Sequence, residues 1–284
     1  MNIEAWQEYR LINDAIEDFV NNIDGSHMKR VVGHACRSGG KKVRPIMLML
    51  STQVCGGDIN KSVEAALAIE LIHSASLIHD DILDQGIVRR GVEAAHEKYG
   101  HGAAMLAGDY LISKSIELLA SYDRNIVREF GQAGMKMAEG ETIDIRSNDE
   151  DAFMCPDYLE CIRKKTAALF AASSAMGAYI AGADDTVAGQ FRSYGESVGS
   201  AYQIVDDLLE YKKVLDDKRS IHRSITLMDI YMREMNYDEA LERTEGVVME
   251  HVHNARTIIN SFEPSDARDR LAQLTEYTTL EMLS

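Results

Sequence analysis

The chain of 284 residues is poor in proline, cysteine and tryptophan, and each shortage narrows the range of folds. It has 3 prolines, 4 cysteines and 1 tryptophan. With so little proline and no low-complexity linker, we expect a single domain over residues 1–284. The cysteines show no Cys-x-x-Cys spacing and no secretory leader precedes them, so we expect free, partly buried thiols in the cytoplasm. They are Cys36, Cys55, Cys155 and Cys161.

Basic charge is also scarce, and this argues against two classes of partner. The formal net charge is -16, and no long basic stripe offsets it. We therefore expect neither nucleic acid nor an anionic membrane surface as the main partner. Residues 166–183 are uncharged, but they are rich in Ala, Gly and Ser, whose transfer into lipid gains little. We predict a buried helix there, and no transmembrane segment.

Strand-like alternation of polar and apolar residues is missing, whereas helical spacing is common. Hydrophobic residues make up 45% of the chain, enough for a substantial core. Apolar side chains recur three and four residues apart, as in Ile12, Ile16, Phe19 and Val20. The sequence therefore predicts an all-α fold, a large antiparallel helical bundle.

Two clusters of acidic residues stand within apolar surroundings. On a helix, the members of each cluster share one side, because residues four apart lie on the same face. So many carboxylates around one cavity would repel one another unless cations sat between them. Oxygen ligands without His or Cys favour Mg²⁺ bound together with substrate phosphates, although two solvated acidic faces are the simpler alternative. The clusters are Asp80, Asp81 and Asp84, and Asp206, Asp207 and Glu210.

Six short segments, in order along the chain, resemble those of the trans-isoprenyl diphosphate synthases (polyprenyl synthetase family). They are residues 39–45 (GGKKVRP), 70–73 (ELIH), 108–111 (GDYL), 140–144 (GETID, with Glu for Gln), 165–167 (KTA) and 203–207 (QIVDD). The resemblance extends roughly over residues 39–210. It implies an all-α bundle around a central cavity, and an enzyme that joins an allylic diphosphate to isopentenyl diphosphate, acting as a homodimer.

The resemblance also implies a role for each matched residue. About three Mg²⁺ ions per active site would polarise the allylic diphosphate. Their principal ligands would be Asp80, Asp81, Asp84 and Asp206, supported by Asp207 and Glu210. The allylic diphosphate would be bound by Arg89, Lys165, Thr166 and Gln203. Isopentenyl diphosphate would be bound by Lys41, Arg44, His73 and Arg90.

One departure from the family keeps other functions open. After the second acidic cluster the family has a glycine-containing loop that closes over the diphosphate, but this chain has no glycine from Ser200 to Glu245. The missing lysine of that loop could be replaced by Lys213, Lys218 or Arg219. A weakly catalytic subunit of a hetero-oligomer is therefore the first alternative. A terpene cyclase is the second, although its usual Asn, Ser and Glu motif is absent.

The residues before the first acidic cluster predict the product length. In the family, an aromatic side chain four or five residues before the first aspartate limits the growing chain, and here those positions are Ser76 and Ala75. The next large side chains, Ile72 and Leu71, lie roughly 12 to 13.5 Å back along a helix. We therefore predict a product of about 20 to 25 carbons, which Ala75→Phe should shorten and Ile72→Ala should lengthen.

Overall fold

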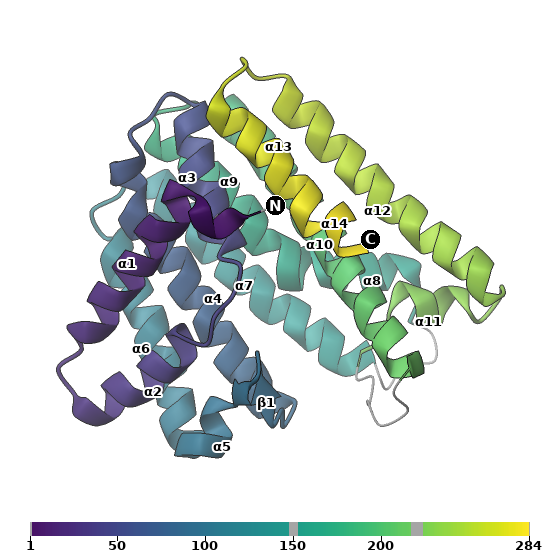
Figure 1. Ribbon diagram of the computed structural model, residues 1–284, viewed down its shortest axis with the longest axis horizontal. Coiled ribbons are helices and arrows are strands. Elements are labelled where there is room, and N and C mark those ends of the chain that lie inside the picture. Colours follow the sequence, from purple (N-terminus) through teal and green to yellow (C-terminus); the bar gives the residue numbers. More distant parts are fainter. Residues whose placement is uncertain (1, 148–152, 217–223, 284) are drawn as a thin grey trace.

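The computed structural model describes residues 2–147, 153–216 and 224–283, and helices dominate it (Figure 1). The helices of the first half are η1 (Ile3–Ala5), α1 (Gln7–Asn21), α2 (Ser26–Cys36), α3 (Val43–Val54), η2 (Ile59–Ser62), α4 (Val63–Leu83), α5 (Ala95–Tyr99), α6 (His101–Leu119) and α7 (Arg124–Ser147). Those of the second half are α8 (Cys155–Ile162), η3 (Arg163–Ala167), α9 (Ala168–Ile180), α10 (Asp185–Asp216), α11 (Leu227–Tyr231), α12 (Tyr237–Asn260), α13 (Asp266–Thr278) and α14 (Leu280–Leu283). The predicted all-α bundle is confirmed.

The buried helix α9 lies at the centre of the bundle. It packs against α3, α7 and α10, while α4 packs against α6, and α12 and α13 run side by side along one edge (Figure 1). Small residues allow these close approaches: a Cβ at Gly177 would lie 2.2 Å from the Leu48 carbonyl oxygen of α3. On the other side, a Cβ at Gly195 of α10 would lie 2.4 Å from the Phe170 carbonyl oxygen. Residues 168–178 are buried as predicted, and none of the described helices is long and apolar enough to cross a membrane.

Two hydrophobic clusters form the core, and α10 belongs to both. Its first half, including Phe191 and Tyr194, packs into the larger cluster with α1, α3, α4 and α9. Its second half, including Ile204 and Leu208, packs into the smaller cluster with α8, α11 and α12. At 32 residues, α10 is roughly 48 Å long and therefore connects the two clusters as one rigid element.

A small antiparallel hairpin, which the sequence did not predict, follows α4. Its strands are β1 (Val88–Arg89) and β2 (Val92–Glu93). Arg90 and Gly91 between them both have positive φ, 51° and 79°. Since two residues with positive φ make the tight turn that joins two strands, this backbone geometry sets the direction of Arg89 and Arg90.

Candidate active site

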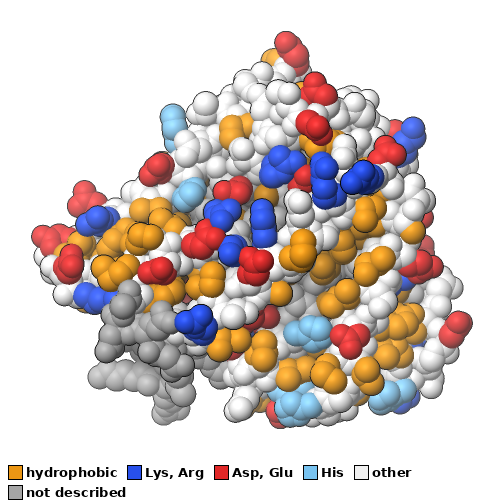
Figure 2. All heavy atoms as spheres, turned by 180° about the vertical axis from the view of Figure 1, so that it is seen from behind, with side chains coloured by type: hydrophobic (Ala, Val, Ile, Leu, Met, Phe, Trp, Pro, Cys, Tyr) orange, Lys and Arg blue, Asp and Glu red, His pale blue; other side chains and the backbone are white. Residues whose placement is uncertain are grey.

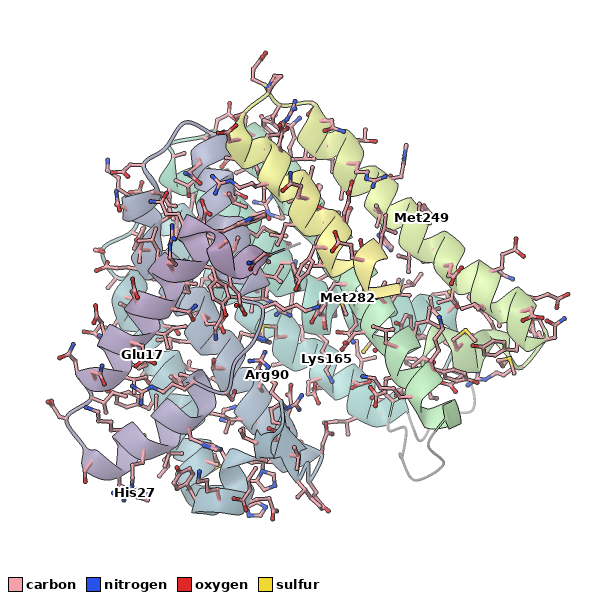
Figure 3. The ribbon with its side chains drawn as sticks, in the orientation of Figure 1. Glu17, His27, Arg90, Lys165, Met249 and Met282 are labelled. Carbon is pink, nitrogen blue, oxygen red and sulfur yellow. The ribbon has the colours of Figure 1, made fainter. Side chains whose placement is uncertain are left out.

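A cavity of about 1060 Å³ opens in the middle of the bundle, lined by residues of α3, α4, β1, α7, α8, η3, α9 and α10. All six acidic residues and all the predicted diphosphate-binding residues line it. Figure 3 shows two of them, Arg90 and Lys165, in this central region. The fold therefore brings together groups that lie far apart in the sequence.

The first acidic cluster stands at the carboxyl end of α4. Asp84 is the C-cap residue, and its backbone N–H donates to the Asp80 carbonyl oxygen (2.8 Å). Burial, and next the negative charge of Glu141, raise the pKa of Asp80 to about 7. The buried Asp81 accepts bonds to Oδ1 from Nε and Nη2 of Arg89 (2.9 and 2.6 Å). The carboxyl end of a helix carries partial negative charge, which adds to the attraction for cations.

The second acidic cluster lies on α10, and its members differ in their surroundings. The side chains of Asp206 and Glu210 are exposed to the cavity. Partial desolvation by the cavity walls raises the pKa of Asp206, and Lys213 lowers it most among the cations. Asp207 is partly buried, and burial raises its pKa to about 7 although Tyr158 and Gln203 bond to it. Lys213 is thus near the cluster, whereas Lys218 and Arg219 lie outside the described residues.

The donor set of the two clusters fits magnesium, although no ion site is assembled in advance. Among the described residues, no three Asp, Glu, His or Cys side chains are grouped so that they could hold an ion alone. All the candidate ligands are carboxylate oxygens, which suit a hard ion that keeps waters and shares substrate phosphates. Burial is the largest cause of the raised pKa values of Asp80 and Asp207, and a cation bound beside them would favour their ionised forms.

Arg44 of α3 and His73 of α4 form a polar pair at the cavity wall. Arg44 Nη1 lies 3.2 Å from His73 Nε2, and because a guanidinium only donates, the neutral imidazole accepts. Burial, and then the charges of Arg44 and Arg90, lower the pKa of His73 well below its ordinary value. The Arg44 guanidinium lies 4.3 Å from the centre of the Phe170 ring, and its buried Nε has no hydrogen-bond partner among the described residues. The pair is therefore positioned to receive an anion.

The two lysines of the segment 39–45 have different surroundings. Lys42, with φ 51°, is buried and its Nζ lies 2.8 Å from Glu70 Oε1. Lys41 is exposed, and its Nζ lies 5.0 Å from the centre of the Tyr277 ring of α13. Only Lys41 is therefore available to a substrate, as the resemblance implies, whereas Lys42 stabilises the junction of α3 and α4.

The two glycines of the same segment lie beside Arg90. Arg90 Nη1 donates to the Gly39 carbonyl oxygen (2.5 Å). A Cβ at Gly40 would lie 2.6 Å from the same nitrogen, and Gly40 has φ +123°, which side chains rarely adopt. The backbone conformation therefore requires glycine at position 40, whereas the flexible end of the Arg90 side chain could move aside.

Lys165 lies in η3, a π-helical turn between α8 and α9. Its Nζ lies 2.7 Å from Glu141 Oε2 and 2.5 Å from Asp144 Oδ2. Burial alone would lower the pKa of Lys165, but Asp144 and Glu141 raise it, so the amine stays charged. A Cβ at Gly140 would lie 2.2 Å from the Lys165 backbone nitrogen, and glycine thus lets α7 approach η3. Such π-helical turns are frequent at functional sites.

Of the four residues predicted to control product length, Ser76 lines the cavity. Its Oγ donates to the His73 carbonyl oxygen (2.9 Å). Ala75, Ile72 and Leu71 are buried in the larger core cluster and are not among the lining residues. Their influence on product length remains a prediction.

Sequence reasoning missed three tyrosines of the cavity region. Tyr158 and Tyr202 line the cavity, and Tyr277 contacts Lys41 from the last part of the chain. Tyr158 stands seven residues before Lys165 and Tyr202 immediately before Gln203, so proximity to a motif could have indicated both. Nothing in the sequence connects Tyr277 with Lys41.

A helical bundle whose cavity combines two carboxylate clusters with arginine and lysine side chains defines a class of protein that handles anionic substrates together with divalent cations. The chain belongs to the polyprenyl synthetase family, whose sequence profile matches residues 26–241. The resemblance seen in the sequence motifs is thereby confirmed.

Similar proteins cover the full length of the chain. The geranylfarnesyl diphosphate synthase of Methanosarcina mazei is 47% identical over 283 residues, which are 100% of this chain and 96% of that protein. A crystal structure of a geranyltranstransferase from Methanosarcina mazei is 45% identical, with a TM-score of 0.88 and complete coverage of both chains. A polyprenyl synthase from Caulobacter crescentus, complexed with calcium and isoprenyl diphosphate, is 26% identical with a TM-score of 0.81, covering 96% of this chain and 97% of that one.

Proposed function

We propose that this protein condenses isopentenyl diphosphate with an allylic diphosphate to give an all-trans prenyl diphosphate of about C20 to C25. It is a prenyltransferase, in agreement with the names of its relatives. The observation that carries the proposal is the single cavity in which both acidic clusters and the Arg44–His73 pair meet. The relative named geranylfarnesyl diphosphate synthase supports a product at the longer end of this range.

The residues of the cavity divide into two groups of anion ligands. Arg44, Arg90, Lys41 and neutral His73 bind the diphosphate of isopentenyl diphosphate, so that its alkene is held beside the second substrate. Arg89, Lys165, Thr166 and Gln203 bind the allylic diphosphate. Several of these groups already bond to protein carboxylates: Arg89 to Asp81, and Lys165 to Glu141 and Asp144. Substrate binding therefore exchanges one anionic partner for another, which keeps the cations oriented before the reaction.

The carboxylates of the two clusters would hold Mg²⁺, about three ions per active site. Asp80, Asp81, Asp84 and Asp206 are the principal ligands in this proposal, with Asp207 and Glu210 in support. When bound, magnesium neutralises the diphosphate oxygens and thereby favours departure of the diphosphate from the allylic carbon. The relative crystallised with calcium and isoprenyl diphosphate supports a divalent cation in this fold.

We propose that the protein is a homodimer and that it works in the cytoplasm. Helix α6 exposes Met105, Leu106 and Ile116, each more than half accessible, and α7 exposes Met135. Figure 2 shows hydrophobic side chains gathered on the face seen from behind. An extended apolar surface of this kind supports association with a second copy. All four cysteines are free, which supports a reducing compartment.

One assay tests the function and its alternatives. Purified protein is incubated with Mg²⁺, radiolabelled isopentenyl diphosphate and geranyl or farnesyl diphosphate, and the dephosphorylated products are separated by chromatography. Elongation to C20–C25 is the expected result, and chelator should abolish it. Asp80→Ala should lower turnover by orders of magnitude, because the magnesium that polarises the diphosphate loses a carboxylate ligand. Release of a hydrocarbon would indicate a cyclase, and activity only with an added partner would indicate a subunit of a hetero-oligomer.

A further inference from the structure

A second cavity, of about 610 Å³, lies at the surface between α2, the hairpin and α5. Of the described residues that line it, three are cationic and none is acidic. On a chain with a net charge of -16, this local concentration of positive charge favours an anion. Figure 3 shows His27 of α2 on this side of the molecule, away from Lys165 of the central cavity. This basic pocket is lined by Ser26, Lys29, Arg30, Gly33, His34, Arg37, Ser38, Val92 and Tyr99.

The cations of the basic pocket are only partly neutralised. Arg37 donates from Nε and Nη2 to the Glu17 carboxylate (2.9 and 2.6 Å), so its charge is paired. Lys29 Nζ instead donates to the Asn21 carbonyl oxygen (2.6 Å), and Arg30 Nη2 donates to an imidazole nitrogen (3.3 Å). Neither Lys29 nor Arg30 forms a salt bridge with a carboxylate of the described residues. Two positive charges therefore remain available to a ligand.

His34 connects the elements around the basic pocket. Its Nε2 lies 2.7 Å from the Glu93 carbonyl oxygen, which only accepts, so Nε2 carries the proton. Its Nδ1 lies 3.4 Å from Lys98 Nζ, which only donates, so Nδ1 accepts. The Tyr99 ring meets the imidazole edge-on, with 5.5 Å between the ring centres. This neutral imidazole therefore joins α2 to β2 and α5, and it keeps a further ammonium group beside the pocket.

The groups of the basic pocket suit a phosphate or diphosphate. Phosphate oxygens accept charge-assisted hydrogen bonds from both Lys29 and Arg30. The first turn of α2 adds partial positive charge, since no side chain of the described residues caps it. Val92 and Tyr99 provide an apolar side against which the hydrocarbon of a prenyl diphosphate would pack. A nucleic acid fits less well, because the chain as a whole is strongly acidic.

The basic pocket shares two segments with the active site. Val92 pairs with Arg89 in the hairpin. Ser38 lines both cavities and precedes Gly39, whose carbonyl oxygen accepts a hydrogen bond from Arg90. A ligand in the basic pocket therefore contacts the same hairpin and the same loop that hold the two arginines of the active site.

From these contacts we infer that the basic pocket is a second anion site, which binds a diphosphate group and acts on the active site through the hairpin β1–β2. The inference rests on the proposed function, because condensation releases inorganic diphosphate and yields a prenyl diphosphate, the two sources of such a group. Occupancy of the pocket then follows the accumulation of product, and the enzyme slows as product builds up.

Binding is measured without turnover, by equilibrium dialysis of the full chain against labelled inorganic diphosphate in chelator. The pocket variant is Lys29→Gln with Arg30→Gln. Its matched control is Arg10→Gln with Lys61→Gln, which also removes one arginine and one lysine, at exposed positions of α1 and η2. Binding in the central cavity is common to all three proteins and cancels in the comparison.

Wild type and the control should bind one diphosphate more per chain than the pocket variant. The affinity of that site should fall more than about tenfold in the variant, since two charge-assisted hydrogen bonds are lost. Equal binding by wild type and the pocket variant would overturn the inference. An equal loss in the control would also overturn it, because the effect would then be general electrostatics.

The same comparison with farnesyl diphosphate distinguishes the two sources of the group. A larger difference between wild type and the pocket variant for the prenyl compound assigns the pocket to the product. Equal differences for the two compounds assign it to free diphosphate.

Inhibition of elongation tests the link to the hairpin, at a fixed concentration of free Mg²⁺. Inorganic diphosphate should lower the kcat of wild type and raise the KM for the allylic substrate, whereas in the pocket variant it should raise only that KM. Purely competitive inhibition of wild type would refute the link. A wild type that binds diphosphate in the pocket but elongates nothing would contradict the proposed function alone, so the two failures are distinguishable.

Discussion

His73 makes the stability of the folded protein depend on pH. In the folded protein its pKa lies well below the ordinary value of 6.5, because of burial and the charges of Arg44 and Arg90. The unfolded chain takes up this proton as the pH falls through about 6.5, whereas the folded chain does not, so the group removes stability in acid. We expect the unfolding temperature of wild type, relative to His73→Gln, to fall between about pH 7.5 and about pH 5.5 in chelator. Parallel curves for the two proteins would contradict a depressed pKa.

Arg44 should not be replaceable by lysine. Its planar guanidinium stacks on Phe170 and bonds to His73 at the same time, and an ammonium group cannot reproduce both contacts. Arg44→Lys should raise the KM for isopentenyl diphosphate about tenfold and that for the allylic substrate less than about twofold. Arg30→Lys, at an exposed position of α2, serves as the control in the same steady-state assay. The opposite preference would mean that the two subsites are exchanged.

At the scale of elements, the face of α4 that lines the cavity should govern product length. Ser76 is on that face, whereas Ala75 is fully buried in the core. Ser76→Phe is therefore expected to fill part of the cavity and shorten the product by one or more C5 units, as judged by chromatography. Ala75→Phe is the companion variant, and from its burial we expect it to lower the unfolding temperature more than Ser76→Phe does. Unchanged products from Ser76→Phe would place the growing chain elsewhere.

The elements themselves were largely predictable, because their signals are local. Apolar residues three and four apart predict helices, and both acidic clusters keep the spacing that puts them on one helical face. The pairing of Asp207 with Tyr158 was not predictable, because it depends on how α8 packs against α10. The same holds for Lys41 and Lys42, since Lys42 has a left-handed backbone and is buried against Glu70 of α4, whereas its neighbour Lys41 is exposed.

At the scale of the whole molecule, the exposed apolar side chains of α6 should form the dimer interface. Met105 and Ile116 are 53% and 59% exposed, so they are not part of the core. Together with the other exposed apolar side chains of α6 they form a patch of the kind that marks protein–protein contacts. The double variant Met105→Asp with Ile116→Asp should sediment as a monomer at micromolar concentration, where we expect wild type to be a dimer. Met249→Asp is the control, because this methionine of α12 is 47% exposed and lies on a different helix (Figure 3). A monomeric wild type, or a double variant that stays dimeric, would contradict the assignment.

At the π-helical turn Arg163–Ala167 the number of residues matters as well as the identity of Lys165 and Thr166. The π-helical turn already holds one residue more than an α-helical turn, so one further inserted residue would rotate everything on one side of it by roughly 100°. Helix α9 cannot take up the rotation, since Gly177 touches α3 and the Phe170 backbone touches α10. The rotation would therefore fall on α8 and carry Tyr158 out of reach of Asp207. Insertions should accordingly be excluded between α8 and α9.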